Sequence, residues 1–437
     1  MMRRSSTKNK LSLIVAIFLS TLFVVFPTPA QDAQYLPGGS PQAKSFNHAA
    51  TQAFNFGKDY AFAIELAKKD IVAINDAANI SLLKQLLATL YTFTGNYDDA
   101  TRYYLKISFD KNIQDNVPKN ATVSYANAVD TIVKLTKGRR AVFINENHGE
   151  PITRVLPLNL LPKLKEQGFT YLALEALTVT PSHHFDKSGC IDTADASLCK
   201  RGYPLDQATT GIYSHEPVYG ELIRTALSLG FRLVAYDPED DTDEQRDRNG
   251  AERLAKLFAD DPNAKLIVLA GEDHIAKEST NMAQVFRDIT SIDPLTVDQA
   301  ALLGLSPSLW GTKQVLNGDA KIVYVNGRPF SSRPGAMDIS IYRPPYSNNR
   351  KSASWLTLGG QRVRTVLSKT PCRSYPCLLS AHLDSESPNS VPSDRFLLQS
   401  KTAAILYLRP GFYTLSAQDA RGVTDRKLQV GTANHGE

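Results

Sequence analysis

Residues 141–175 read AVFINENHGEPITRVLPLNLLPKLKEQGFTYLALE and decide the fold of this chain of 437 residues. The opening run, AVFIN, is apolar without a break, which is typical of a strand buried on both faces. A helical pattern, ITRVLPLNLLPKLKEQG, follows and stops at Gly168. A second apolar run, YLALE, completes a strand–helix–strand unit. This order predicts parallel strands covered by helices.

The same alternation continues along the chain. It adds buried strands at 231–236 and 264–271, and helices at 216–230, 242–260 and 277–289. Thr242 stands before the helix of 242–260 as a candidate N-cap. We therefore predict an α/β domain over 137–345, with a central, mostly parallel sheet flanked by helices.

The first thirty residues have the three parts of an export signal. A basic start, MMRRSSTKNK, precedes the apolar run LSLIVAIFLSTLFVVF, and PTPA ends in small residues suited to cleavage before Gln31. The apolar run is short for a membrane span, which takes about 20 residues. We predict a signal peptide at 1–30, a periplasmic or secreted mature protein, and no stable membrane span after cleavage; the alternative is an uncleaved anchor.

The charge balance gives no sign of a nucleic-acid partner. The formal net charge of the whole chain is +5, and residues 1–30 contain four basic and no acidic residues, so the mature chain carries +1. A nearly neutral chain lacks the excess of Lys and Arg that binds phosphates. We predict a small-molecule or peptide substrate instead.

The four cysteines form two close pairs in a compartment predicted to be oxidising. Local pairing, Cys190 with Cys199 and Cys372 with Cys377, is the simplest of three possible connectivities. A zinc site made of all four is the alternative, but their spacing does not match two CxxC pairs.

Three further regions flank the α/β domain: a linker at 31–44, a helical region at 45–136 and a β-rich domain at 346–432. In the helical region Tyr60 and Ala63 recur as Tyr97 and Ala100, an offset of 37 residues that resembles the tetratricopeptide period of about 34. This region either binds a protein partner or braces the next domain. Short runs with turn residues between them predict strands after residue 345.

Titratable side chains follow every predicted strand of the α/β domain. They are Glu146, His148 and Arg154 after the first strand, Glu175 after the second, Asp237 and Glu239 after the third, and His274 after the fourth. Ligands bind outside the carboxyl ends of the strands in open parallel sheets, so these residues should meet at one edge. Candidates for binding the substrate are His184, His215, Arg246 and Asn249.

Two kinds of chemistry use these residue types. In the first, the two glutamates and two histidines ligate Zn, Mn, Fe or Co, which turns a bound water into a nucleophile. In the second there is no metal: His148 is the general base on a water, Glu146 or Glu175 orients it, and Arg154 or His274 stabilises the oxyanion. Both lead to hydrolysis.

The segment INENHGEPITRVLPLNLLPKLKEQGFTYLALEAL resembles the opening of the erythromycin-esterase-like and haem-binding ChaN-like superfamily, which also includes Tiki-type proteases. The resemblance covers about 138–300 and places the family's Glu and His elements at Glu146, His148, Glu175 and His274. It implies ester or peptide hydrolysis in some branches and haem binding in another. The spacing of Glu146 and His148 matches the ChaN-like form, and Asn145 replaces the usual Gly.

These observations predict an exported hydrolase that activates water to cleave an ester or amide bond, with metal assistance as an option. The first alternative is a protein that binds haem or another small ligand at the same site without turnover. The second is a scaffold that binds partners and carries a vestigial site.

Overall fold

The computed structural model describes residues 59–74, 77–104, 121–186, 188–238, 243–271, 273–310 and 318–431. The predicted signal peptide, the linker, Glu239 and the N-cap at Thr242 lie outside these residues. No helix within the described ranges is long and apolar enough to cross a membrane.

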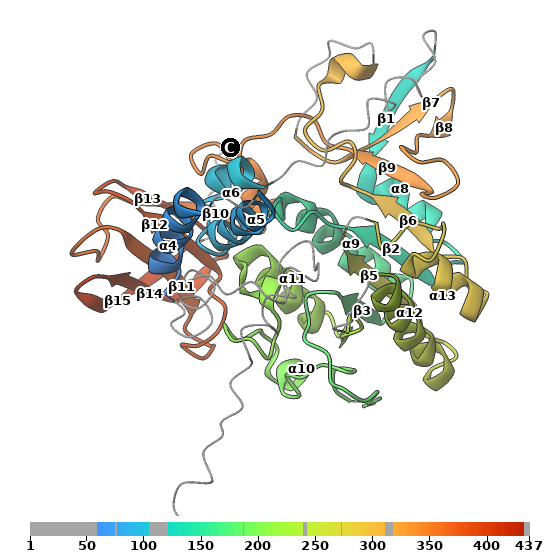
Figure 1. The fold of residues 1–437 in the computed structure, drawn as a ribbon, viewed down its shortest axis with the longest axis horizontal. Coiled ribbons are helices and arrows are strands. Elements are labelled where there is room, and N and C mark those ends of the chain that lie inside the picture. The colour runs from blue at the N-terminus through green and yellow to red at the C-terminus, as the bar shows by residue number, and fades with distance from the viewer. Residues whose placement is uncertain are drawn as a thin grey trace, which may run out of the picture.

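A nine-stranded sheet forms the centre of the molecule (Figure 1), in the order β1-β7-β9-β6-β2-β5-β3-β4 with β8 beside β7. The strands are β1 (Val123–Asn127), β2 (Ala141–Asn145), β3 (Tyr171–Leu174), β4 (Arg232–Val234), β5 (Leu266–Ala270), β6 (Leu295–Asp298), β7 (Lys321–Val325), β8 (Arg328–Pro329) and β9 (Ile339–Tyr342). From β9 to β4 all pairings are parallel, and β1, β7 and β8 form an antiparallel extension at one end. The sheet is therefore mixed but mostly parallel.

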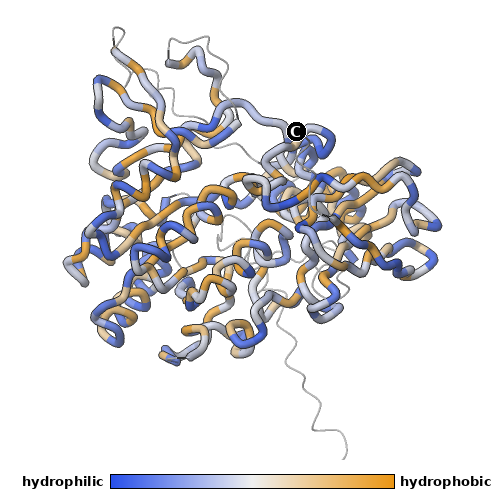
Figure 2. Tube along the Cα trace, turned by 180° about the vertical axis from the view of Figure 1, so that it is seen from behind, coloured by the Kyte–Doolittle hydropathy of each residue, from blue (hydrophilic) through white to orange (hydrophobic). Residues whose placement is uncertain are grey.

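Both faces of the parallel strands are covered by helices. In β2, Val142 and Ile144 point into a core shared with α8 (Ala128–Leu135), α9 (Val155–Glu166) and α11 (Pro217–Ser228). Ala141 and Phe143 point to the other face, which α12 (Asp243–Asp260) and α13 (Met282–Thr290) cover. This period of two explains why the strands are apolar throughout. The apolar strands form a hydrophobic band through the molecule in Figure 2.

Helix α9 ends where the sequence predicts. Gly168 adopts a positive φ of 85°, a conformation that favours glycine, and its N–H donates to the carbonyl of Lys165 at 2.9 Å. A four-residue 3-10 turn, η1 (Pro151–Arg154), joins β2 to this helix. The turn matters for the site because it carries Arg154 at its end.

The helical region contains α4 (Tyr60–Ala73), α5 (Ala77–Phe93) and α6 (Tyr97–Tyr103). The repeated tyrosines, Tyr60 and Tyr97, are the first residues of α4 and α6, and both are buried. The phenol of Tyr60 donates to Asp206 at 2.7 Å and that of Tyr97 to Glu216 at 2.8 Å. The region thus braces the α/β domain. A tetratricopeptide origin and a protein partner stay predictions.

The prediction of helix throughout 45–136 is wrong at β1. This strand pairs antiparallel with β7, so Val123 faces Val325 across the ladder. Its residues are partly buried or exposed, and its partner lies in a distant part of the chain, so local periodicity does not reveal it. The central sheet consequently begins before residue 137.

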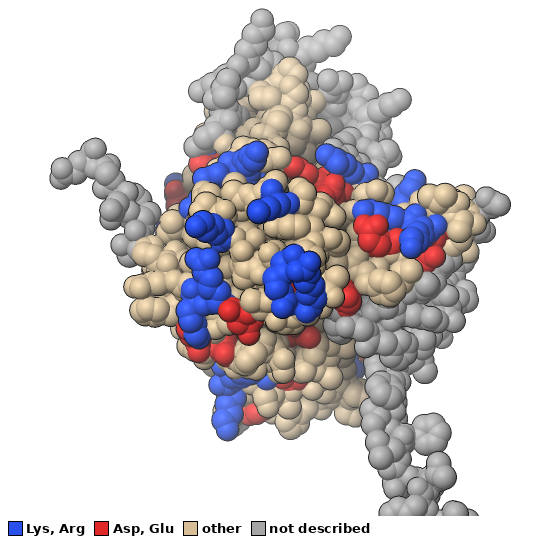
Figure 3. Space-filling view, turned by 90° about the vertical axis from the view of Figure 1, so that its left-hand side faces the viewer, with Lys and Arg blue, Asp and Glu red and all other residues tan. Residues whose placement is uncertain are grey.

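The C-terminal domain is β-rich, as predicted. A two-stranded and a four-stranded antiparallel sheet share one apolar core. Their strands are β10 (Val363–Leu367), β11 (Cys377–Leu383), β12 (Asp394–Leu398), β13 (Ala404–Leu408), β14 (Gly411–Asp419) and β15 (Gly422–Val430). Two further 3-10 turns are η3 (Pro307–Trp310) and η4 (Ser354–Thr357). On the side of the molecule that Figure 3 shows, Asp and Glu side chains lie among the Lys and Arg side chains.

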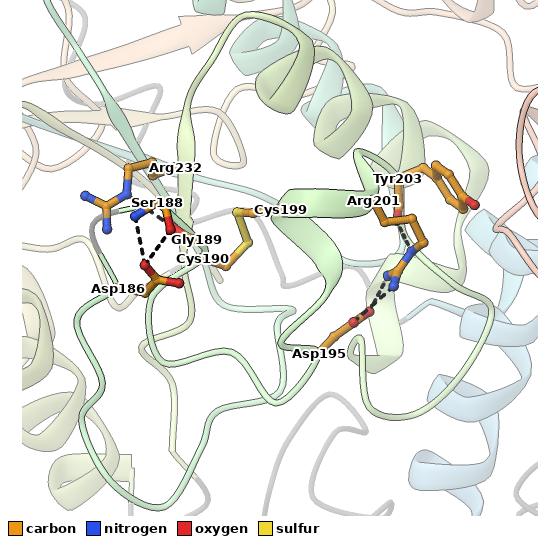
Figure 4. Close-up of a disulfide and its surroundings, with 9 residues drawn as sticks. All are labelled: Asp186, Ser188, Gly189, Cys190, Asp195, Cys199, Arg201, Tyr203 and Arg232. Carbon is orange, nitrogen blue, oxygen red and sulfur yellow. Dashed lines mark hydrogen bonds and ion pairs between the residues drawn. A yellow bond between two sulfur atoms is a disulfide. The ribbon is translucent and has the colours of Figure 1, made fainter.

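Both predicted disulfides are present, Cys190–Cys199 and Cys372–Cys377. The first closes a loop after β3 that also contains α10 (Leu198–Arg201), and an ion pair between Arg201 and Asp195 at 2.5 Å lies beside it (Figure 4). The disulfide and this ion pair lie within the long excursion, and a backbone bridge between Ile191 and Val234 of β4 attaches it to the edge of the sheet.

Candidate active site

The candidate site lies at the carboxyl edge of three neighbouring strands, β2, β5 and β3. The ladder continues past the strand ends: the N–H of Glu146 donates to the carbonyl of Ala270 at 2.7 Å, and the N–H of Glu175 to that of Leu269 at 3.1 Å. Both glutamates therefore start from backbone that the sheet holds fixed. His148, two residues past Glu146, and His274, on the turn after β5, complete the group.

The imidazole of His148 is held by two carboxylates and one ring. Its Nδ1 lies 2.9 Å from Oε1 of Glu146, and its Nε2 lies 3.7 Å from Oε1 of Glu175. The ring of Tyr213 stacks on it, with centroids 4.1 Å apart and planes inclined by 10°. Burial works against the charged form, but the two carboxylates outweigh it and raise the pKa of His148 to about 9. His148 is therefore an imidazolium at neutral pH.

A buried ion-pair chain supports Glu146 from behind. Arg154 is completely buried, donates from Nε to Oε2 of Glu146 at 2.6 Å, and donates from Nη1 to Oε2 of Glu216 at 2.9 Å. Glu216 also accepts from Tyr97 and caps the N-terminus of α11. Burial tends to raise the pKa of Glu146, but Arg154 and His148 hold it below its usual value. Glu146 is thus fixed as a carboxylate.

Glu175 is the carboxylate on which the site converges. Its Oε1 accepts from Nη2 of Arg246 at 2.7 Å, and its Oε2 accepts from the backbone N–H of Gly271. Arg246 also donates two bonds of 2.6 Å to Asp237, so its guanidinium is fixed between two acids. Burial again opposes ionisation, but His148, Arg246 and His274 hold the pKa of Glu175 well below its usual range.

His274 repeats the arrangement of His148 on the other side of Glu175. Its Nδ1 lies 2.5 Å from Oδ1 of Asp247, and its Nε2 lies 4.0 Å from Oε1 of Glu175. Burial lowers the pKa of His274, but Asp247 and Glu175 together raise it above the ordinary value. Each histidine therefore has a carboxylate at Nδ1, which orients the ring, and directs Nε2 at one shared oxygen.

Gly271 marks the space between these groups. A Cβ at this position would lie 3.3 Å from Oε2 of Glu175, 3.3 Å from Nε2 of His148 and 3.4 Å from Cδ2 of His274. Its backbone has no positive φ, so the lack of a side chain, rather than backbone freedom, is what the site uses here. A reacting group beside Gly271 is within reach of all three side chains.

The structure brings five predicted residues together: Glu146, His148, Arg154, Glu175 and His274. Arg246 joins them, but as the partner of Glu175 and Asp237.

The other three predicted substrate-binding residues make contacts of their own. The His215 ring is buried against Asp206, beneath the helical region, and Asn249 bonds to Gln245 on α12. His184 bonds through its backbone to Asp192 in the disulfide loop. None of the contacts named for these three residues involves Glu175, and their role in binding substrate stays a prediction.

Sequence reasoning missed Tyr213, Asp247, Glu216 and Tyr97. Asp247 and Glu216 are direct chain neighbours of predicted residues, so their positions carried a signal: a carboxylate next to a candidate on a helix often supports the site. Tyr213 and Tyr97 approach through space from other parts of the chain. The repeat offset marks Tyr97 but not its contact with Glu216, and no spacing marks Tyr213.

The arrangement does not fit the predicted metal centre. Among the described residues, no group of three or more His, Cys, Asp and Glu side chains is placed to hold an ion. Oε1 of Glu175, which both imidazoles face, already accepts from Arg246. We therefore assign no step to a metal. Haem binding, the other cofactor prediction, stays a prediction.

No protein-family model and no curated protein matches the chain. Among solved structures, the type III effector HopBA1 is 15% identical over 52% of this chain and 96% of its own, with a TM-score of 0.33. RRSP, a MARTX toxin effector domain from Vibrio vulnificus CMCP6, is 19% identical over 56% of this chain and 49% of its own, with a TM-score of 0.25. A structure described as bacterial protein toxins is 18% identical over 62% and 57%, with a TM-score of 0.28. Similarity this weak carries no argument about function.

Proposed function

We propose that the protein is an exported hydrolase in which His274 and His148 act as general base and general acid on an ester or amide bond. The observation that carries the proposal is the pair of carboxylate-bound imidazoles whose Nε2 atoms face one oxygen of Glu175, at 3.7 and 4.0 Å. The resemblance to the erythromycin-esterase-like superfamily supplies the bond type. The predicted signal peptide supplies the location.

The roles of the two histidines follow from their surroundings. His148 has two carboxylates about it and keeps its proton to about pH 9, so it is suited to donate a proton. This differs from the sequence-based prediction that His148 is the base. His274 keeps one carboxylate, Asp247, at Nδ1, so its neutral form presents an unprotonated Nε2 towards Glu175. A water between that nitrogen and Oε1 of Glu175 would contact both, because 4.0 Å is spanned by two hydrogen bonds.

The proposed reaction then balances as follows. The water attacks the carbonyl carbon while its proton moves to Nε2 of His274, and the π electron pair of the carbonyl moves to oxygen. When the tetrahedral intermediate collapses, the bond to the leaving oxygen or nitrogen breaks and His148 protonates that atom. The products are a carboxylic acid and an alcohol or amine. Glu175 stays ionised throughout, orienting the water and balancing the cations around it.

The test is turnover of a panel of p-nitrophenyl esters and chromogenic peptide amides by the mature protein. His274→Ala is expected to lower kcat by about 10²–10⁴-fold, the range for a general base. His183→Ala is the matched control: His183 also lies between carboxylates, Asp192 and Asp260, and its side chain is 21% exposed, as is that of His274. Equal activity in the wild type and His274→Ala would contradict the proposal.

The same preparation discriminates the alternatives. Elemental analysis and an absorption spectrum are run on protein purified without chelator. A Soret band with no turnover on the panel would favour haem binding instead. Neither turnover nor a bound group would favour the scaffold with a vestigial site.

A further inference from the structure

Tyr213 is the side chain at the site whose position the reaction described above does not yet use. It lies in the 3-10 turn η2 (Ile212–His215), between the disulfide loop and α11, and is 6% exposed. Its ring stacks on that of His148 at 4.1 Å. Stacking on a cation accounts for the ring. It does not account for the hydroxyl group.

The hydroxyl of Tyr213 has no hydrogen-bond partner among the residues that the structure describes. A buried tyrosine normally finds one, as Tyr97 does with Glu216 at 2.8 Å. Nor is this oxygen sealed in the protein: the hydroxyls of Tyr125 and Tyr219 are enclosed without a partner, whereas that of Tyr213 is not. The phenol is therefore a donor that no described residue engages.

Among the charges around the phenol, Glu175 acts on it most strongly and Glu146 less so. Glu175 faces Nε2 of His148, whereas Glu146 faces Nδ1. Burial raises the pKa of Tyr213 well above its usual value, so the phenol keeps its proton at neutral pH and remains a donor.

We propose that Tyr213 is a catalytic residue whose hydroxyl donates a hydrogen bond to the oxyanion formed from the substrate carbonyl. The proposal rests on the hydrolysis proposed above. As water adds to the carbonyl carbon, the π pair moves to oxygen and the Tyr213 O–H binds the charge. As the intermediate collapses, the pair re-forms the C=O bond. No proton leaves Tyr213. The ring holds the acid, and the hydroxyl stabilises the intermediate.

Arg154 and His274, the two residues that the sequence predicts for this role, are engaged elsewhere. The Nε donor of Arg154 is used by Glu146 and its Nη1 donor by Glu216, and the guanidinium is completely buried. His274 is the base in the same step. An unpaired neutral donor beside the acid is what oxyanion stabilisation requires, because it is oriented before the charge develops.

Tyr213→Phe tests the hydroxyl alone, since the stacked ring is retained. We expect kcat to fall by about 10²–10³-fold, the effect of removing one oxyanion donor, with KM changed less than about threefold. Binding of a phosphonate that mimics the tetrahedral intermediate, measured by calorimetry, should weaken by a similar factor. Tyr125→Phe is the control, because it removes an unpaired phenol hydroxyl on β1, at the far end of the sheet.

The outcomes separate this assignment from the proposed function. If Tyr213→Phe turns over substrate and binds the phosphonate within about threefold of the wild type, the oxyanion assignment is wrong and the hydrolysis stands. If the wild type neither hydrolyses the panel nor binds the phosphonate, both fail. A fall in kcat with unchanged phosphonate affinity also overturns the assignment, since a positioning role alone explains it.

Discussion

Replacing Glu146 by Gln tests whether His148 is held as a cation. The ordinary pKa of histidine is about 6.5, and that of His148 is raised to about 9, a difference of about 2.5 pH units or about 3 kcal/mol. Glu146 makes the shorter contact, 2.9 Å against 3.7 Å for Glu175. We therefore expect Glu146→Gln to lower the pKa of His148 by at least about one unit.

The assay is an NMR titration of the histidine ring protons, with the His148 signal identified by its loss in His148→Ala. Glu150→Gln is the matched control, because Glu150 is also buried near the turn but its carboxylate accepts from Tyr346 at 2.8 Å. It should leave the titration of His148 unchanged.

Stability gives a second measure of the same effect. The pKa of His148 is raised in the folded state, so its contribution is fully present below about pH 6.5 and is lost as the pH rises through about 9. Denaturant unfolding of the wild type between pH 6 and pH 10 should show a loss of about 3 kcal/mol from this group. The loss should be smaller in Glu146→Gln. A His148 that titrates near 6.5 in the wild type, or a pKa that Glu146→Gln does not move, would refute the reasoning.

Three further predictions concern the rest of the site. Gly271→Ala should fold normally but lose turnover about 10²-fold, because its methyl would lie 3.3 Å from Nε2 of His148; normal kinetics would contradict this. Tyr97→Phe removes the 2.8 Å bond to Glu216 and should cost about 1.5–3 kcal/mol of unfolding free energy and slow turnover, measured by denaturant titration and kcat. Dialysis against a chelator should leave turnover unchanged, since Arg246 already occupies Oε1 of Glu175; loss of activity that Zn restores would argue for a metal centre.

The parallel part of the fold was predictable because short, continuous stretches of the sequence determine it. Continuous apolar runs such as 141–145 and 266–270 are strands buried on both faces, and helices between them leave a parallel sheet as the outcome. The antiparallel extension was not predictable, because β1 pairs with β7 across a long stretch of chain. The local disulfide pairs followed from short spacing in a compartment predicted to be oxidising.

The site was predictable to the extent that strand ends determine it. Glu146, Glu175 and His274 follow neighbouring strands, so their meeting at one edge needs only the topology. Their protonation was not predictable, because it depends on contacts made through space. The contacts of Glu146 and Glu175 with His148, and the bond between Asp247 and His274, changed the expected base from His148 to His274.

The dependence of kcat/KM on pH, measured with a p-nitrophenyl ester, tests the acid–base account most directly. The account predicts a bell with an acid limb above the ordinary histidine value of about 6.5, set by His274, and an alkaline limb near 9, set by His148. Asp247→Asn should move the acid limb to lower pH and leave the alkaline limb in place. A profile that rises steadily with hydroxide concentration, or limbs that persist in both His274→Ala and His148→Ala, would contradict the account.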